Sequence, residues 1–90
     1  QLLYSRELAS SNYQEVIDML PLSLAEPRVP QSIAKITGKD EVRRHLSELG
    51  LVVGEEVTVI SSLAGNLILQ VKDSRIALDR ELANRIMVRG

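Results

Sequence analysis

The sequence has no cysteine, no tryptophan and no phenylalanine, and it has only two tyrosines, Tyr4 and Tyr13. The lack of cysteine excludes disulfides, thiolate zinc sites and cysteine nucleophiles. The shortage of aromatic residues argues against recognition of proline-rich peptides, because that recognition uses aromatic-lined grooves. The composition therefore removes several classes of site before any motif is considered.

An excess of charge of one sign is also missing, since eleven basic and twelve acidic residues give a formal net charge of −1. Proteins that bind nucleic acid usually carry a strong basic excess, because they neutralise phosphates. Four arginines near the C-terminus are interleaved with acidic residues, as in a salt-bridged surface: Arg75, Arg80, Arg85 and Arg89 with Asp73, Asp79 and Glu81. We expect no nucleic-acid partner.

Long apolar runs are absent, and the longest are short stretches such as 67–69. A spanning helix needs roughly 20 consecutive apolar residues, so direct membrane insertion is not expected. No basic segment followed by an apolar stretch opens the sequence, so no secretory signal is visible. Together with the lack of cysteine, this pattern predicts a cytoplasmic protein.

No catalytic motif is present. Ser61, Ser62 and Ser74 have no histidine base in a recognisable arrangement. Gly50 and Gly54 lie between a helix and a strand, in the wrong order for a phosphate-binding loop. The sequence therefore predicts a protein that is not an enzyme.

Residues 1–20 are expected to form an N-terminal helical extension, separate from a domain at 21–90. Ser11 and Gln14 have the spacing of a capping box. An apolar stripe at i, i+3, i+4 and i+7 follows and predicts a helix over 12–19: Tyr13, Val16, Ile17 and Leu20. This stripe would pack on the chain's own domain or support self-association, so a homo-oligomer is one expectation.

The clearest element is a helix over 40–49. Asp40 is a suitable N-cap, and the apolar residues of the helix lie on one narrow stripe that includes Leu46 and Leu49. Gly50 follows where the chain needs a left-handed backbone conformation, and Leu51 would then contact Leu46. Gly54 is predicted to lie in the turn that leads into the next strand.

Short runs of alternating hydrophobicity predict five strands: 33–37, 55–61, 67–72, 75–78 and 86–88. Gly65 and Asn66 indicate a hairpin between the second and third strands, and Asp79 can cap a helical turn before the last strand. Short, evenly spaced strands usually solve the problem of exposed edges by closing into a small barrel. The predicted fold is therefore mainly β, with one helix after the first strand.

The segment LGLVVG at 49–54, between a helix and a strand, resembles the FeoA family, the small SH3-like proteins of bacterial ferrous iron uptake. The resemblance runs from about residue 21 to 88 and includes PLSLAEP near the start and SRIALDRELANRIMV near the end. Val53 departs from the family pattern, which commonly has proline there. The resemblance implies a five-stranded SH3-like barrel.

The resemblance also implies a function, that of a non-enzymatic accessory protein of ferrous iron uptake. Such a protein would bind the cytosolic GTPase part of the FeoB-type membrane transporter. The same barrel occurs in the C-terminal domain of metal-dependent repressors, so a metal-sensing regulatory module is the alternative. No cofactor is required, although weak binding of Fe²⁺ or another divalent transition metal stays open.

His45, the single histidine, has Glu41 four residues before it and Glu48 three residues after it. On a helix, these side chains could offer one nitrogen and two oxygens to a divalent metal ion. The competing interpretation is a solvated helix face on which Arg44 pairs with Glu41 and Glu48.

Contact with a partner protein is the role that the sequence favours. Apolar residues beside the two glycines and at the hairpin tip are not required by a monomer, although exposed apolar residues are common. The expected contact residues are Arg43, Arg44, Val52, Val53, Gly54, Leu63 and Ala64.

Overall fold

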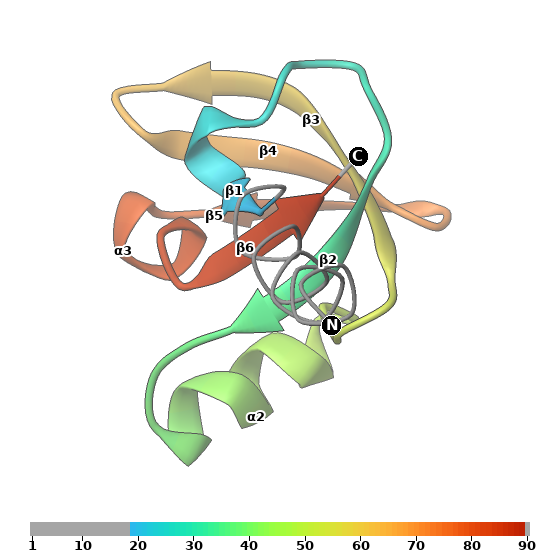
Figure 1. Cartoon of the computed structure of the whole chain (residues 1–90). Helices are drawn as coiled ribbons and strands as arrows, with labels where there is room; N and C mark the ends of the chain where they lie inside the picture. The colour runs from blue at the N-terminus through green and yellow to red at the C-terminus, as the bar shows by residue number, and fades with distance from the viewer. Residues whose placement is uncertain (1–18, 90) are drawn as a thin grey trace, which may run out of the picture.

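A computed structural model describes residues 19–89 of the chain (Figure 1). Its elements, in chain order, are β1 (Leu20–Pro21), the 3-10 helix η1 (Leu22–Leu24), β2 (Gln31–Ile36), α2 (Asp40–Glu48), β3 (Glu56–Leu63), β4 (Asn66–Val71), β5 (Ser74–Leu78), α3 (Arg80–Ala83) and β6 (Ile86–Arg89). The predicted extension over 1–20 and the predicted helix over 12–19 lie outside the described residues up to residue 18, and Met19 is not helical.

The strands form one antiparallel sheet in the order β1-β6-β2-β3-β4-β5. The class is mainly β, as predicted, but the expected count of five strands is wrong because the described residues form six. The additional strand is β1, in which Leu20 pairs with Val88 and Pro21 pairs with Met87. As a consequence, α2 follows the second strand, not the first, and Leu20 belongs to a strand, not to a helical stripe.

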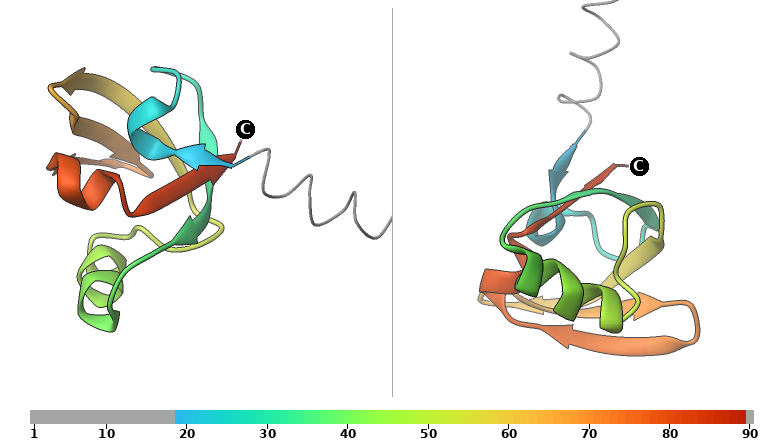
Figure 2. Two further views of the ribbon diagram at one scale, coloured as in Figure 1. Left: turned by 60° about the vertical axis from the view of Figure 1, so that its left-hand side comes forward. Right: turned by 90° about the horizontal axis from the view of Figure 1, so that it is seen from below.

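One hydrophobic core joins the sheet to the helices, and among the described residues no polar side chain is buried in it. Alternation along the strands places Val57 and Val59 of β3 inside, opposite inward residues of β4 such as Leu69. Leu46 is the one fully buried residue of α2, and Figure 1 shows this helix apart from the strands, at the lower end of the molecule. Two other views show the sheet curving around the core (Figure 2).

The end of α2 has the predicted geometry. Gly50 has a φ of +91°, its N–H donates to the Ser47 carbonyl at 2.9 Å, and the Leu51 N–H donates to the Leu46 carbonyl at 2.9 Å. These two bonds form a Schellman motif, and Leu46 and Leu51 are both buried in the core. At the other end the prediction is wrong: the N-cap is Lys39, with no side-chain cap, and Asp40 lies in the first turn.

Two hairpins connect β3, β4 and β5. Ala64 and Gly65 form the first turn, with φ values of 54° and 86°, and Leu63 pairs with Asn66 beside it. Positive φ at both central residues is the signature of a type I′ turn, which matches the twist of the strands. Val71 pairs with Ser74 around the second turn, at 72–73.

Helix α3 is held to the first hairpin by its N-terminal end. The Asp79 side chain accepts a hydrogen bond from the Leu82 N–H at 2.9 Å, as expected of a capping residue. The Asn66 side-chain oxygen accepts from the Arg80 N–H at 2.9 Å. The hairpin tip and the start of α3 therefore hold one another in place.

Candidate partner-contact surface

The turn between α2 and β3 presents two apolar side chains to solvent. The Glu55 N–H donates to the Val52 carbonyl at 3.0 Å, and Gly54, the third residue of this four-residue turn, has a φ of +95°. This geometry is that of a type II turn. Val53 is 62% exposed and Val52 is 41% exposed, so the turn displays both valines.

Strand β2 fixes the position of this turn. The Gly54 N–H donates to the Ile33 carbonyl at 2.8 Å, and the Ile33 N–H donates to the Glu55 carbonyl at 2.9 Å. Ile33 itself is buried in the core. Two hydrogen bonds to a buried residue make the turn a rigid support for the exposed valines, which lowers the entropy cost of binding.

An open hollow of about 340 Å³ lies beside the turn. Its lining residues come from the end of α2, the turn and the second hairpin: Ser47, Leu49, Gly50, Val52, Glu55, Val71, Lys72 and Ser74. The Lys72 ammonium and the Glu55 carboxylate form an ion pair at 3.7 Å in this lining. The turn therefore has both a protruding apolar part and an adjacent recess.

Helix α2 adds exposed arginines next to the turn. The Arg43 guanidinium pairs with the Asp40 carboxylate at 2.9 Å, both on the solvent side. The predicted pairing of Arg44 with Glu41 and Glu48 is wrong, since Arg44 has no ion pair among residues 19–89. Arg44 is exposed.

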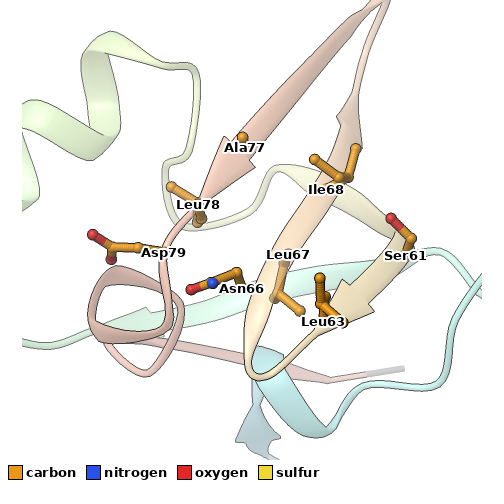
Figure 3. Close-up of a pocket in the computed structure, with 8 residues that line it drawn as sticks. All are labelled: Ser61, Leu63, Asn66, Leu67, Ile68, Ala77, Leu78 and Asp79. Carbon is orange, nitrogen blue, oxygen red and sulfur yellow. The ribbon is translucent and has the colours of Figure 1, made fainter.

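The other predicted contact residues, Leu63 and Ala64, lie at the tip of the first hairpin. Leu63 is 79% exposed. It lines an open, mostly apolar hollow of about 480 Å³ over the outer face of β3, β4 and β5 (Figure 3). The hollow is lined by Ser61, Leu63, Asn66, Leu67, Ile68, Ala77, Leu78 and Asp79.

The predicted contact residues therefore fall into two groups, which we call the α2 turn surface (Arg43, Arg44, Val52, Val53 and Gly54) and the hairpin tip (Leu63 and Ala64). They lie at the two ends of β3, whose residues run from 56 to 63. At about 3.3 Å per residue β3 is at most about 23 Å long, since it has a bulge between Val59 and Ser61. The two groups cannot share one small contact, although one large partner could cover both.

The hollow beside the hairpin tip was not predicted from the sequence. Its floor is formed by residues that are neighbours only across strands: Ser61 pairs with Ile68, and Ile68 pairs with Ala77. The signal was the position of Ile68 on the solvent side of an alternating strand, where it is 36% exposed.

The predicted metal ligands all lie on α2, where Glu41, His45 and Glu48 are exposed. Across residues 19–89, no three histidine, aspartate or glutamate side chains come together in a way that could hold a metal ion. The metal site stays a prediction of the sequence.

The four C-terminal arginines are exposed or half-exposed, but the expected ion pairs are not formed. In residues 19–89, none of these arginines has a carboxylate within 4.0 Å. Arg75 instead donates from Nε to the Gln70 side-chain oxygen at 3.1 Å.

No helix in the described part of the chain has the length and hydrophobicity needed to span a membrane.

Comparison with known proteins agrees with this architecture. The FeoA domain model matches residues 20–90. The "Putative Fe(2+) transport protein A" of Methanocaldococcus jannaschii is 33% identical over 70 residues, which cover 78% of this chain and 85% of that protein. A crystal structure of an iron uptake regulatory protein, FeoA, is 32% identical with a TM-score of 0.74, covering 79% of this chain and 96% of that one.

A metal-dependent repressor shares the fold at lower identity. T. acidophilum IdeR has a TM-score of 0.70 and 21% identity, over 79% of this chain and 33% of IdeR. At this identity the likeness concerns the fold alone. These likenesses are consistent with the predicted SH3-like fold. The family model and the two FeoA relatives together show that the chain belongs to the FeoA family.

Proposed function

We propose that this protein is a non-enzymatic, cytoplasmic accessory of ferrous iron uptake that binds the cytosolic GTPase part of a FeoB-type membrane transporter. The observation that carries this proposal is membership of the FeoA family over residues 20–90. The relatives named above are described as an iron(II) transport protein and an iron uptake regulatory protein, which supports a role in iron uptake.

The proposed mechanism is binding, without turnover. Docking biases the conformation or the assembly of the transporter, because a partner shifts an equilibrium by its difference in affinity for the two states. The α2 turn surface suits such docking, since hydrogen bonds to β2 hold the turn and it combines exposed Val52 and Val53 with the exposed guanidinium of Arg44. Arginine is enriched in protein contact sites, and the two valines add exposed apolar area beside it.

The charge of this surface suggests the chemistry of its partner. Arg44 projects from α2 without an ion pair among residues 19–89, so an acidic side chain on the transporter could pair with it. Charge complementarity of this kind accelerates encounter and fixes orientation more than it raises affinity. The apolar contact would come from the two valines, and Val53 protrudes further than Val52.

The test is titration of the chain with the purified cytosolic part of the transporter, without nucleotide, with GDP and with a non-hydrolysable GTP analogue. Association in at least one state is expected. Val53→Asp should weaken it at least tenfold, because the aspartate would have to be desolvated at the contact. Since Val53 is 62% exposed, the substitution leaves the core intact.

Val29→Asp is the matched control, because Val29 is also exposed, at 39%, and lies outside the α2 turn surface. It should bind like the wild type. Leu63→Asp reports whether the partner also covers the hairpin tip. Equal weakening by Val53→Asp and Val29→Asp would contradict the assignment of the α2 turn surface, and no association in any nucleotide state would contradict the function.

The alternative, a metal-sensing regulatory module, has the fold likeness to IdeR in its favour. In that case Fe²⁺ or another divalent ion would be the signal, with His45, Glu41 and Glu48 as the proposed ligands. Anaerobic calorimetric titration with Fe²⁺ separates the two functions. Binding heat that His45→Ala removes would support the alternative, and identical heat in both proteins would reject this site.

A further inference from the structure

The two edges of the sheet differ in how they are protected. β1 forms one edge with two residues, one of which is Pro21, and β5 forms the other with the five residues Ser74–Leu78. Short length, proline, lysine and bulges normally prevent an edge strand from pairing with another chain. β1 has two of these devices, whereas β5 contains neither proline nor lysine and pairs with β4 without a bulge.

The outward backbone groups of β5 can be assigned from its hairpin. Val71 and Ser74 flank a two-residue turn, so they form a hydrogen-bonded pair, and hydrogen-bonded and non-hydrogen-bonded pairs then alternate. Ile76 therefore bonds to β4, while the N–H and C=O of Arg75 and Ala77 point away from the sheet. Within residues 19–89, no other element hydrogen-bonds to the backbone of β5.

The charged side chains along this edge are complementary to those of a second, antiparallel copy of β5. An antiparallel pair of β5 strands centred on Ala77 places Arg75 of each copy opposite Asp79 of the other, and Ile76 opposite Leu78. In this register the outward N–H and C=O of Ala77 meet those of Ala77 in the other copy, and the Arg75 carbonyl meets the Asp79 N–H. The Asp79 carbonyl takes no part, because it accepts from the Ala83 N–H at 2.9 Å. Pairs centred on Arg75 or on Asp79 would bring like charges together, which is destabilising. Only the register centred on Ala77 forms two opposite-charge pairs.

Both charged groups have atoms available for these pairs. Arg75 uses Nε for its bond to Gln70, which leaves both terminal nitrogens. Asp79 accepts from the Leu82 N–H through Oδ1, which leaves Oδ2. Both side chains belong to exposed residues. The backbone of Asp79, with a φ of −75° and a ψ of 169°, is extended and continues the strand direction.

We propose that β5 is a self-association edge, on which two copies of this chain pair antiparallel about Ala77 and join their sheets. The contact is isologous, so it closes at a dimer and does not propagate. Ala77 lies beside Ile68 on the outer face (Figure 3), so the apolar floor of each hollow ends at the shared edge. This inference does not depend on the proposed function.

The test is sedimentation equilibrium of the full chain over a wide concentration range. Ala77→Pro removes an outward N–H that β4 does not use, so the fold should persist while the dimer weakens at least tenfold. Ala77→Ser keeps the N–H and is the matched control, with dimerisation like the wild type. A monomer at all concentrations, or unchanged dimerisation of a folded Ala77→Pro variant, would overturn the proposal.

A charge-exchange experiment tests the register. Arg75→Glu and Asp79→Lys should each weaken self-association, since each places like charges opposite one another, and a one-to-one mixture should restore pairing as a heterodimer. If Asp79→Lys does not fold because the α3 cap is lost, Arg75→Glu must still weaken the dimer at low salt, and less so at 1 M salt. A dimer insensitive to Arg75→Glu would overturn the register.

Amide hydrogen exchange separates a second copy from other occupants of the edge. In the wild type, protection of the Ala77 N–H should rise with protein concentration and be lost in Arg75→Glu. Protection that does not change with concentration would mean that another segment of the same chain covers β5. That result would overturn the proposal.

Discussion

Gly50→Ala should destabilise the protein through backbone strain alone. A Cβ at Gly50 would meet only Val71 Cγ1 within 4 Å, at an ordinary contact distance of 3.9 Å, while the φ of +91° is one that alanine rarely adopts. An alanine in the left-handed region costs about 1–2 kcal/mol. Alanine also lowers the conformational entropy of the unfolded chain, which offsets about 0.4–1 kcal/mol of this cost. The net loss of unfolding free energy should be about 1 kcal/mol.

Substitutions at two other glycines with positive φ allow the destabilisation to be compared between sites. Gly54 has a φ of +95° and nothing within 4 Å of its added Cβ, so Gly54→Ala should cost the same as Gly50→Ala. At Gly65 the added Cβ would lie 2.5 Å from Cδ of Arg80, so Gly65→Ala carries the strain and must also displace that side chain. The predicted order of destabilisation is Gly65→Ala first, with the other two equal.

Urea unfolding followed by circular dichroism measures these differences. A loss of about 1 kcal/mol lowers the melting temperature of a domain this size by about 4–8 °C. Gly50→Asn should lose less than Gly50→Ala, since asparagine tolerates positive φ better. Glu48→Ala, an exposed change at the end of the same helix, is the control and should stay within about 0.5 kcal/mol. A Gly50→Ala protein as stable as the wild type would refute the reasoning.

Three further substitutions test separate parts of the fold by the same urea assay. Leu46→Ala should cost about 2–5 kcal/mol, because Leu46 is the one fully buried residue of α2, and a loss below 1 kcal/mol would mean that the helix is not anchored there. Val53→Pro should add about 0.4–1 kcal/mol, since proline suits the second position of a type II turn; destabilisation would contradict the turn assignment. Ala64→Asn should be stabilising, because Ala64 has a φ of 54°, and an unchanged midpoint would argue against strain at this tip.

Local chemistry explains what the sequence predicted well. Gly50 ends α2 because the left-handed position needs glycine, and this requirement is visible without knowledge of the rest of the chain. The cap at Asp79 and the turn at Gly65 belong to the same class, since each depends on residues within three positions.

The errors have two causes, one long-range and one local. β1 exists because Leu20 and Pro21 meet β6, almost the whole domain away in sequence, and a two-residue strand has no periodicity of its own. Asp40 is a residue type that suits an N-cap, but the Arg43 guanidinium binds its carboxylate and the N-cap is Lys39, one residue earlier than expected.

The candidate surfaces were predictable in composition but not in arrangement. Exposed apolar residues such as Val53 and Leu63 stand out in the sequence, whereas their separation along β3 is a property of the folded sheet. The hollow next to Leu63 needs Ile68 and Ala77 to be cross-strand neighbours, which depends on the register of two hairpins. Sequence patterns indicate which residues of a surface are exposed, and strand pairing determines which of these residues become neighbours.

The central claim is that this FeoA-family protein acts by binding the cytosolic GTPase part of a FeoB-type transporter. Calorimetric titration of these two purified proteins, in the nucleotide-free, GDP and GTP-analogue states, tests it most directly. We expect saturable one-site binding in at least one state, weakened at least tenfold by Val53→Asp and unchanged by Val29→Asp. An absence of binding heat in all three states, with both proteins folded, would contradict it.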